Sequence, residues 1–160
     1  DSLGGCFTVV LTGLPAGLGS YVQWDRRLDG LLAQAMMSIP AIKGMEIGDG
    51  FAAARLRGLE AHAAIQLDPS GALIRPTNHA GGVEGGVSNG QPIVIRAAMK
   101  PIPTTVTPQQ SVDLATRLAA ATSYLRSDVC AVPAASVVGE AMAAWVVAVA
   151  LLDRQGGDTL

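Results

Sequence analysis

The feature that most constrains the fold is a glycine-rich run at residues 78–91, which reads NHAGGVEGGVSNGQ. Four glycines stand between positions 81 and 86, and a fifth follows at Gly90. Neither a helix nor a strand needs this density, because glycine is favoured where φ is positive or where backbone passes close to another group. The run therefore predicts one of two structures: a plain glycine-rich hairpin loop, or a loop whose backbone N–H groups bind an anionic or carbonyl oxygen.

The segment after the run supplies a candidate cation. Alternating residues at 93–99 predict a strand, which ends at Lys100 and is stopped by Pro101 and Pro103. A lysine held beside prolines and threonine hydroxyls suits a phosphate, although a solvated lysine at a strand end is the simpler interpretation. The run itself fits neither dinucleotide nor P-loop motifs, because it lacks GxGxxG at a helix start and no GK[ST] follows.

Composition indicates a single globular domain over residues 1–160. Hydrophobic residues make up 49% of the chain and charged residues 15%, so a sizeable core is expected. Nucleic-acid binding needs a basic face, and a chain with a net charge of −2 gives no indication of one, so no nucleic-acid partner is expected. Cys6 and Cys130 have no CxxC or histidine partner nearby, which argues against a metal site. Two reduced thiols are expected, with a long-range disulfide as the alternative.

Hydrophobic periodicity predicts the elements of the N-terminal half. Residues 7–12 favour a short strand, and the Gly and Pro content of 13–20 favours a loop. Apolar residues recur at helical spacing from residue 28 to 39, with Asp25 as the expected N-cap and Pro40 as the stop. The stretches that follow are expected to be extended at 41–47, turning at 48–50, irregular at 51–67 and briefly apolar at 72–74.

Two helices are predicted in the C-terminal half. Residues 107–110 have the pattern of a capping box with proline at the first helical position, and apolar residues continue that helix to Tyr124. From Val132 to about Leu152 nearly every position is apolar, which is typical of a helix that is buried in a core or spans a membrane. Glu140 inside this stretch favours the core helix.

Two further pairs of residues are candidates for chemistry. Arg126 and Asp128 either form a surface ion pair of small energetic value, or bind an anion and place a carboxylate for proton transfer. His62 and His79 are the two histidines, and His79 is the better acid–base candidate because it lies in the glycine run. A lone histidine is nevertheless more often structural.

Taken in order along the chain, these segments resemble chorismate synthase. The resemblance extends over nearly the whole chain, and several of the matching stretches are long and specific. They are 13–19 (GLPAGLG), 37–44 (MSIPAIKG), 46–51 (EIGDGF), 78–82 (NHAGG), 85–90 (GGVSNG), 99–101 (MKP), 126–133 (RSDVCAVP) and 140–142 (EAM).

The resemblance covers only the C-terminal part of that family's longer chain. The family's N-terminal part carries a Gly-Glu-Ser-His type motif and a Gly-Gly-Arg-Ser-Ser/Ala-Arg type motif, which supply two catalytic histidines and several arginines. Neither motif is in this sequence, and neither His62 nor His79 matches those histidines. The chain shows no signal peptide and starts at Asp1 without a methionine, so we expect Asp1 to mark an internal cut and the chain to be the C-terminal part of a longer protein.

The resemblance implies an α+β fold, with helices packed on antiparallel sheet as part of a β-α-β sandwich, and a cytoplasmic homotetramer. The implied reaction is the conversion of 5-enolpyruvylshikimate 3-phosphate to chorismate by anti-1,4-elimination of phosphate, on the shikimate pathway to aromatic amino acids. Reduced FMN is the implied cofactor and undergoes no net redox change; the protein supplies position and electrostatics. An accompanying NAD(P)H-dependent flavin reductase is left open.

The resemblance also implies site residues. Asp128 corresponds to the family's aspartate near flavin N5, with a catalytic role in proton transfer, and Arg126 beside it would help with phosphate. Pro40 departs from a common family version that has asparagine at this position. Because proline has no N–H, the FMN contact here is expected mainly from Ala41. The implied FMN contacts are Pro40, Ala41, Gly85, Lys100, Pro101, Ile102, Pro103, Thr104 and Arg126.

The resemblance bears on two predicted helices and on three hypotheses of function. It implies an extended structure for 111–124, against the helix that the capping-box pattern predicts, so the secondary structure of that segment is left undecided. It also places the helix after Pro133 inside the sandwich rather than in a membrane. The leading hypothesis is part of a chorismate synthase that is inactive without the N-terminal part. The alternatives are a catalytically inactive folding or oligomerisation module, and a membrane-associated protein built on the helix at 134–152.

Overall fold

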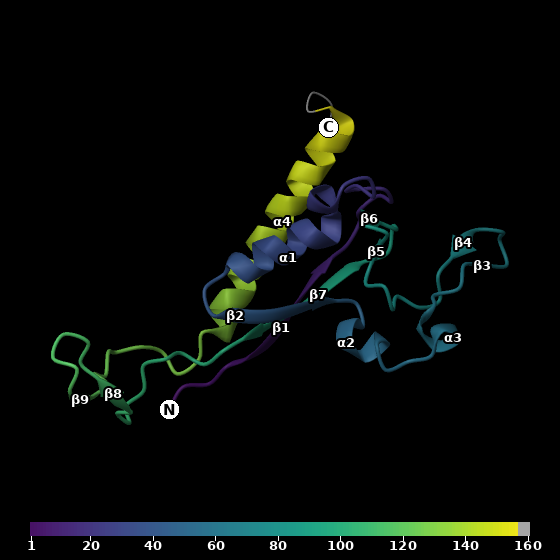
Figure 1. Ribbon diagram of the computed structural model, residues 1–160. Coiled ribbons are helices and arrows are strands. Elements are labelled where there is room, and N and C mark those ends of the chain that lie inside the picture. The colour runs from purple at the N-terminus through teal and green to yellow at the C-terminus, as the bar shows by residue number, and fades with distance from the viewer. Residues whose placement is uncertain (157–160) are drawn as a thin grey trace.

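The computed structural model describes residues 1–156 and is built around a three-stranded antiparallel sheet. The strands are β1 (Gly5–Leu11), β7 (Ile93–Met99) and β2 (Ile42–Ile47), with β7 in the middle. Two helices, α1 (Leu28–Ser38) and α4 (Val132–Gln155), lie across one face of this sheet (Figure 1). Helices on one face of an antiparallel sheet make an α+β arrangement, as expected.

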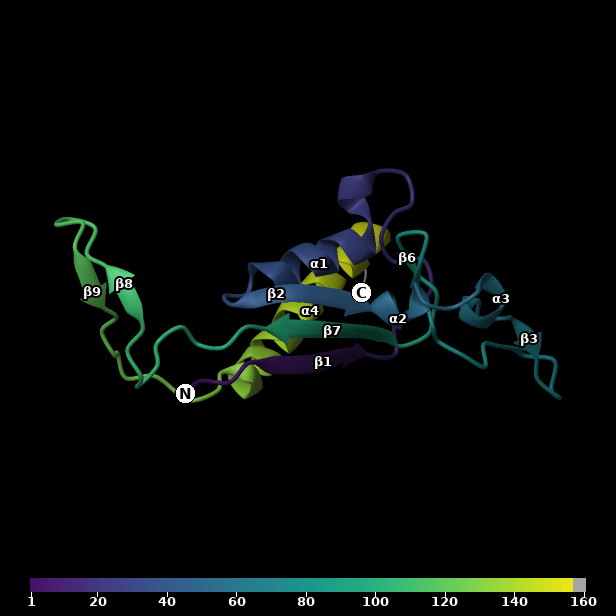
Figure 2. The same cartoon turned by 60° about the horizontal axis from the view of Figure 1, so that its bottom comes forward.

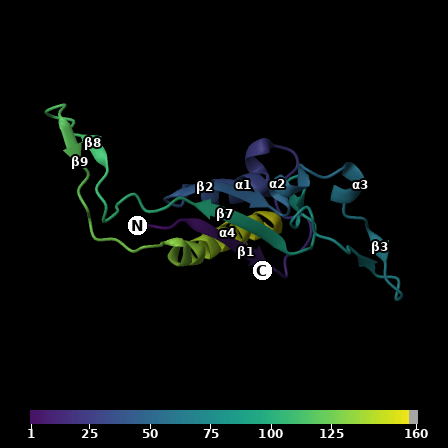
Figure 3. The same cartoon turned by 90° about the horizontal axis from the view of Figure 1, so that it is seen from below.

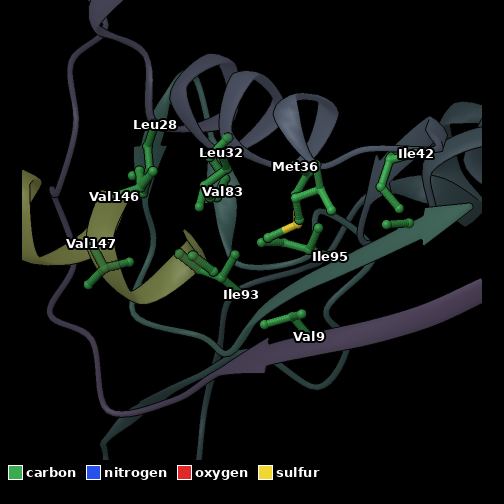
Figure 4. Packing of buried hydrophobic residues seen from close by; sticks show 14 of the residues in the cluster. Val9, Leu28, Leu32, Met36, Ile42, Val83, Ile93, Ile95, Val146 and Val147 are labelled. Atoms are coloured by element: carbon green, nitrogen blue, oxygen red, sulfur yellow. The ribbon is translucent and has the colours of Figure 1, made fainter. Parts of the chain in front are cut away.

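The core lies between the sheet and the two helices. Strand residues alternate between buried and exposed, as a half-covered sheet requires, so that β7 turns Ile93, Ile95 and Ala97 toward the helices. Leu32 and Met36 of α1 fill the space above them and are fully buried (Figure 4). Truncation of such a residue to alanine typically costs about 2–5 kcal/mol, so this layer fixes the fold.

Helix α1 begins later than its sequence predicted. Asp25 is not its N-cap: it lies in a separate 3-10 turn, η1 (Trp24–Arg26), and Arg27 occupies the N-cap position without a side-chain cap. Asp29 instead binds the Arg27 guanidinium at 2.6 Å, which raises the pKa of Arg27. The helix ends at Ser38, and the chain turns extended at Ile39 because the next residue is proline.

Helix α4 is confirmed, and one of its faces packs on the sheet. Gly139 lies against the Phe7 ring of β1, and Ala143 is fully buried. The opposite face exposes apolar side chains, including Trp145 and Val149, so the all-round burial expected of a core helix is not reached within residues 1–156. By length and composition alone α4 also qualifies as a candidate membrane span, which is weak evidence for a helix that packs on a sheet.

Two segments extend away from the core in opposite directions (Figures 2 and 3). The first, predicted to be irregular, contains two one-turn helices and a short hairpin. These are α2 (Gly50–Ala53), α3 (Gly58–Ala61), β3 (Gln66–Leu67) and β4 (Leu73–Ile74).

The second extended segment corrects a prediction. The capping-box helix expected from 107 to Tyr124 is wrong: the segment is a hairpin of β8 (Gln110–Val112) and β9 (Ala119–Ala121). Thr107 forms no capping box; instead the Thr122 hydroxyl accepts a bond from the Gln109 N–H at 2.9 Å and extends the hairpin. Both cysteines are free thiols, so the disulfide alternative is also wrong.

Candidate functional site

The glycine run folds as a tight hairpin, β5 (Val83–Glu84) and β6 (Val87–Ser88), joined by Gly85 and Gly86. Both glycines have positive φ, at 62° and 91°, as two-residue hairpin turns of this kind require. The run is therefore a hairpin, and the remaining question is whether its backbone also meets a ligand.

Most glycines of this run are explained by packing inside the protein. A Cβ on Gly86 would approach the Ser20 carbonyl oxygen to 2.6 Å, and one on Gly82 would approach the Pro92 carbonyl oxygen to 2.5 Å. Ser88, buried beneath the hairpin, donates to the Pro15 carbonyl oxygen at 2.7 Å and accepts the Leu18 N–H at 2.9 Å. Gly85 differs, because a Cβ there would meet no atom within 4 Å. Its backbone faces open space, where a ligand can approach.

A second cluster forms at the far end of β7. The Lys100 N–H donates to the Ala41 carbonyl oxygen at 2.9 Å, which joins the end of β7 to the turn between α1 and β2. Ala41 has a φ of +68°, a left-handed conformation that a residue with a side chain adopts at some cost. The turn at Pro40–Ala41 is thus held in one conformation beside Lys100.

The chain on either side of the β8–β9 hairpin meets at this end of the sheet. The Thr104 hydroxyl donates to the Ser127 hydroxyl at 3.0 Å, so the predicted segments 100–104 and 126–128 are in direct contact. The N-terminus holds both: the Ser2 hydroxyl donates to the Ile102 carbonyl oxygen at 2.5 Å, and the Leu3 N–H donates to the Val129 carbonyl oxygen at 2.8 Å. Pro101 and Pro103 lie between these contacts and keep the segment extended.

Charged side chains of this cluster are available to a ligand. Lys100, Arg126 and Asp128 are all exposed, and none forms a side-chain hydrogen bond or ion pair with another residue of 1–156. Two cations and two hydroxyls, on Thr104 and Ser127, therefore share one end of the sheet with one carboxylate. This donor set suits a phosphate monoester.

The structure separates the predicted site residues into two groups. Gly85 precedes the start of β7 and Lys100 follows its end, and a strand of seven residues extends over about 20 Å. Helix α1 runs between the same two ends, since the Leu28 N–H binds the Gly86 carbonyl oxygen and Ala41 follows its C-terminus. Gly85 and the Lys100 cluster are thus at opposite ends of the sheet in one chain.

One pair of polar residues was not predicted from the sequence. His79 Nδ1 lies 2.5 Å from Asp49 Oδ2, and the Asp49 N–H binds the His79 carbonyl oxygen at 3.0 Å. Gly48 and Gly81, both with positive φ, pack backbone to backbone beside the pair. His79 therefore holds two loops together, while His62 lies on the exposed segment after α3 and takes part in no such pair. The only sequence signal was the position of His79 in the glycine run.

The larger hollows of the surface lie away from the Lys100 cluster. A mostly apolar hollow of about 520 Å³ lies between α1, β2 and α2, and Trp24, Met45 and Phe51 are among the residues that line it. This hollow offers few polar groups to an anion, whereas the Lys100 cluster offers two cations and two hydroxyls. Among the described residues no group of three or more His, Cys, Asp or Glu side chains is placed to hold a metal ion.

Comparison with known proteins identifies the family. The chorismate synthase family model matches residues 1–152. Chorismate synthases from Moorella thermoacetica and Desulforamulus reducens are 60% and 56% identical over the whole of this chain, which covers 42% and 41% of their lengths. A crystal structure of chorismate synthase superimposes with a TM-score of 0.79 at 51% identity, covering 99% of this chain and 40% of that one. The chain thus spans about two fifths of the length of these relatives, and it belongs to the chorismate synthase family.

Proposed function

We propose that this chain provides the C-terminal part of a chorismate synthase active site. The proposed reaction is the anti-1,4-elimination of phosphate and a ring hydrogen from 5-enolpyruvylshikimate 3-phosphate, which gives chorismate. The observation that carries the proposal is the contact between Thr104 and Ser127, which joins segments 100–104 and 126–128 beside Ala41. Residues distant in sequence thereby form one cationic, hydroxyl-rich site.

The donors of this cluster fit FMN. The phosphate of the cofactor needs cations and hydroxyl donors, which Lys100, Arg126 and Thr104 supply, and the Ala41 turn offers backbone at the same place. When bound, reduced FMN supplies the transient electron density that the elimination requires. The protein's contribution is to bind and orient the anionic groups in a fixed electrostatic environment.

Asp128 is the proposed acid–base group. Its carboxylate is exposed, lies two residues from Arg126, and has no partner among residues 1–156, so it can accept or hold a proton at Oδ. Arg126 would orient the departing phosphate, because a guanidinium matches phosphate with two parallel N–H donors.

Gly85 has a separate proposed role. Because it stands at the other end of the sheet, we assign its contact to FMN held by a second copy of the chain, in line with a homotetramer of the complete protein. The cytoplasm is the proposed location, without membrane or nucleic-acid partners. The competing function is a folding or oligomerisation module without catalysis, and the observation that favours it is the uncovered apolar face of α4.

A flavin titration tests the proposal. Lys100→Ala and Arg126→Ala should each weaken FMN binding about tenfold, since a charge-assisted hydrogen bond at an exposed site contributes about 1.4 kcal/mol. Arg55→Ala is the matched control, because Arg55 is an exposed arginine just after α2 that belongs neither to the Lys100 cluster nor to the β5–β6 hairpin with Gly85, and its loss should not affect affinity. If both variants bind FMN as tightly as the unmutated chain, the assigned cofactor site is wrong.

Turnover separates the two functions. We expect no chorismate from the 160-residue chain alone with reduced FMN under anaerobic conditions, because the family's histidine and arginine motifs are not in it. Within a complete enzyme, Asp128→Asn should lower kcat while FMN affinity is kept. Turnover by the chain alone would contradict the requirement for those motifs, and an Asp128→Asn enzyme with full kcat would remove Asp128 from the mechanism.

A further inference from the structure

An acidic residue, Glu84, stands directly before the glycine whose backbone faces open space. Glu84 is the last residue of β5, and Gly85 follows it in the turn to β6. The Glu84 side chain is 43% exposed, so its carboxylate lies at the surface of the hairpin. An anion that approaches the Gly85 backbone therefore meets a negative charge on the neighbouring residue, and like charges repel. A contact between Gly85 and the anionic FMN needs the Glu84 charge to be held and neutralised.

Two side chains hold the Glu84 carboxylate. Arg75 Nη1 lies 2.9 Å from Glu84 Oε2, and the Asn89 side-chain amide donates to the same oxygen at 2.9 Å. Arg75 comes from outside the hairpin, because it follows β4 at the end of the extended segment that joins the core beside β5 and β6 (Figure 1). A cation and an amide thus converge on one oxygen, so the carboxylate is both paired in charge and fixed in place.

The two donors are themselves held. Asn89 Oδ1 accepts the Gln91 N–H at 3.0 Å, which turns the amide nitrogen of Asn89 toward Glu84. The Gln91 side chain donates to the carbonyl oxygens of Arg75 and Thr77 at 3.3 and 3.0 Å, and so anchors the backbone that carries Arg75. Gln91 Oε1 is buried without a partner in the described part of the chain, so this anchoring is kept at a cost in desolvation.

Stability alone does not account for this network. Water solvates a partly exposed glutamate well, and ion pairs at such sites contribute little to the free energy of folding. The hairpin is moreover held by other bonds, because the Leu28 N–H donates to the Gly86 carbonyl oxygen at 2.8 Å and Ser88 is bonded on both sides beneath it. The network instead sets where the Glu84 charge lies relative to Gly85.

We propose that Arg75 is a positioning residue for the FMN contact at Gly85: with Asn89 it holds and neutralises the Glu84 carboxylate, so that an anionic cofactor can approach the turn. This inference rests on the proposed function. A carboxylate released from Arg75 would be free to turn toward the Gly85 backbone, and its charge would act on the FMN phosphate over about 8–10 Å in ordinary salt. Arg75 acts through Glu84 and need not touch the cofactor.

FMN titration of a complete enzyme that contains this chain tests the inference. Arg75→Ala should weaken FMN binding about threefold, because it leaves the Glu84 charge unpaired beside an anionic ligand. Its circular dichroism and Tm should change little, since the ion pair is partly exposed. Arg55→Ala is the matched control: it removes the same charge from the same extended segment, outside the β5–β6 hairpin, and affinity should be unchanged.

A rescue variant separates the effect of charge from that of structure. Glu84→Gln alone should bind FMN within about twofold of the unmutated enzyme, and adding it to Arg75→Ala should restore the lost affinity, because the unpaired charge is then absent. The loss in Arg75→Ala should also shrink toward none in about 1 M salt, where screening limits the interaction to about 3 Å.

Two results overturn the inference. One is an Arg75→Ala enzyme with unchanged FMN affinity, and the other is a double variant as weak as Arg75→Ala, which would mean that Arg75 only holds its own segment. Lys100→Ala is titrated beside them. If Lys100→Ala weakens FMN binding and Arg75→Ala does not, this inference alone fails. Unchanged affinity in Lys100→Ala refutes the proposed cofactor site and the inference with it.

Discussion

The contact between α4 and β1 allows a quantitative prediction at Gly139. This glycine sits inside a 24-residue helix, where replacement by alanine ordinarily stabilises by about 1 kcal/mol. Here, however, the added methyl would lie 2.6 Å from Cε2 and 3.1 Å from Cζ of the Phe7 ring. Phe7 is only 7% exposed, so its ring cannot move aside without disturbing the core.

The two opposing effects can be compared. Overpacking of a core by one methyl costs about 1–3 kcal/mol, which exceeds the gain in helix propensity. We therefore expect Gly139→Ala to lower the free energy of unfolding by about 1 kcal/mol, and Tm by about 2–4 °C for a domain of this size. Urea unfolding followed by circular dichroism measures the first quantity, and a thermal melt the second.

Two companion variants isolate the cause. Ala144→Gly, at an exposed position of the same helix, should lose about 1 kcal/mol and so reports the propensity of this helix alone. Phe7→Leu should make Gly139→Ala less harmful, with a coupling energy of about 0.5–3 kcal/mol in a double-mutant cycle. A Gly139→Ala chain that is more stable than the unmutated one, with no coupling to Phe7, would refute the packing of α4 on β1.

Three further predictions concern the loops and the β8–β9 hairpin. Gly48→Ala should destabilise the chain by about 2–4 kcal/mol in urea, because φ is +60° and a Cβ would collide with the His79 carbonyl; a loss below 1 kcal/mol contradicts this. Ser127→Ala should weaken FMN binding about threefold with little change in Tm, measured by titration and melting, since it removes an exposed hydroxyl contact with Thr104; unchanged affinity would separate that contact from the site. Bonds from the Thr116 and Ala115 N–H groups hold the pKa of Asp113 below its ordinary 3.8, so the stabilisation of the turn is complete above that pH and is lost as pH falls through the lower folded value. Amide exchange at Thr116 should therefore speed up at acid pH, beyond the intrinsic pH dependence, and equal protection at pH 2 and pH 6 would contradict it.

The central sheet and both long helices were predictable because their periodicity agrees with their burial. Residues 93–99 alternate in sequence, and β7 buries alternate side chains in the structure. Asp25 was misassigned as the N-cap of α1 because a capping residue type marks a helix start only if the helix begins directly after it. Here Asp25 lies within the 3-10 turn η1, and α1 begins only at Leu28. The β8–β9 hairpin misled for a related reason: the capping-box pattern is local, whereas hairpin pairing between 110–112 and 119–121 is decided by contacts seven to eleven residues apart.

The candidate site was predictable only in part. The pattern around Lys100 indicated an anion partner, and the family resemblance supplied Arg126 and Asp128, but only the fold shows that Thr104 and Ser127 touch. Sequence order likewise suggested that the glycine run and Lys100 share one site, whereas β7 places them at its two ends. The His79–Asp49 pair had no sequence signal beyond position, because its two residues are thirty positions apart.

Mapping of FMN-induced amide shifts by NMR tests the central claim most directly. In the 160-residue chain, titration with FMN should shift the amides of Ala41, Lys100, Thr104 and Arg126 together, with one common dissociation constant. Shifts confined to the hollow beside Trp24 and Phe51, with the Lys100 cluster unchanged, would contradict the assignment of the cofactor site.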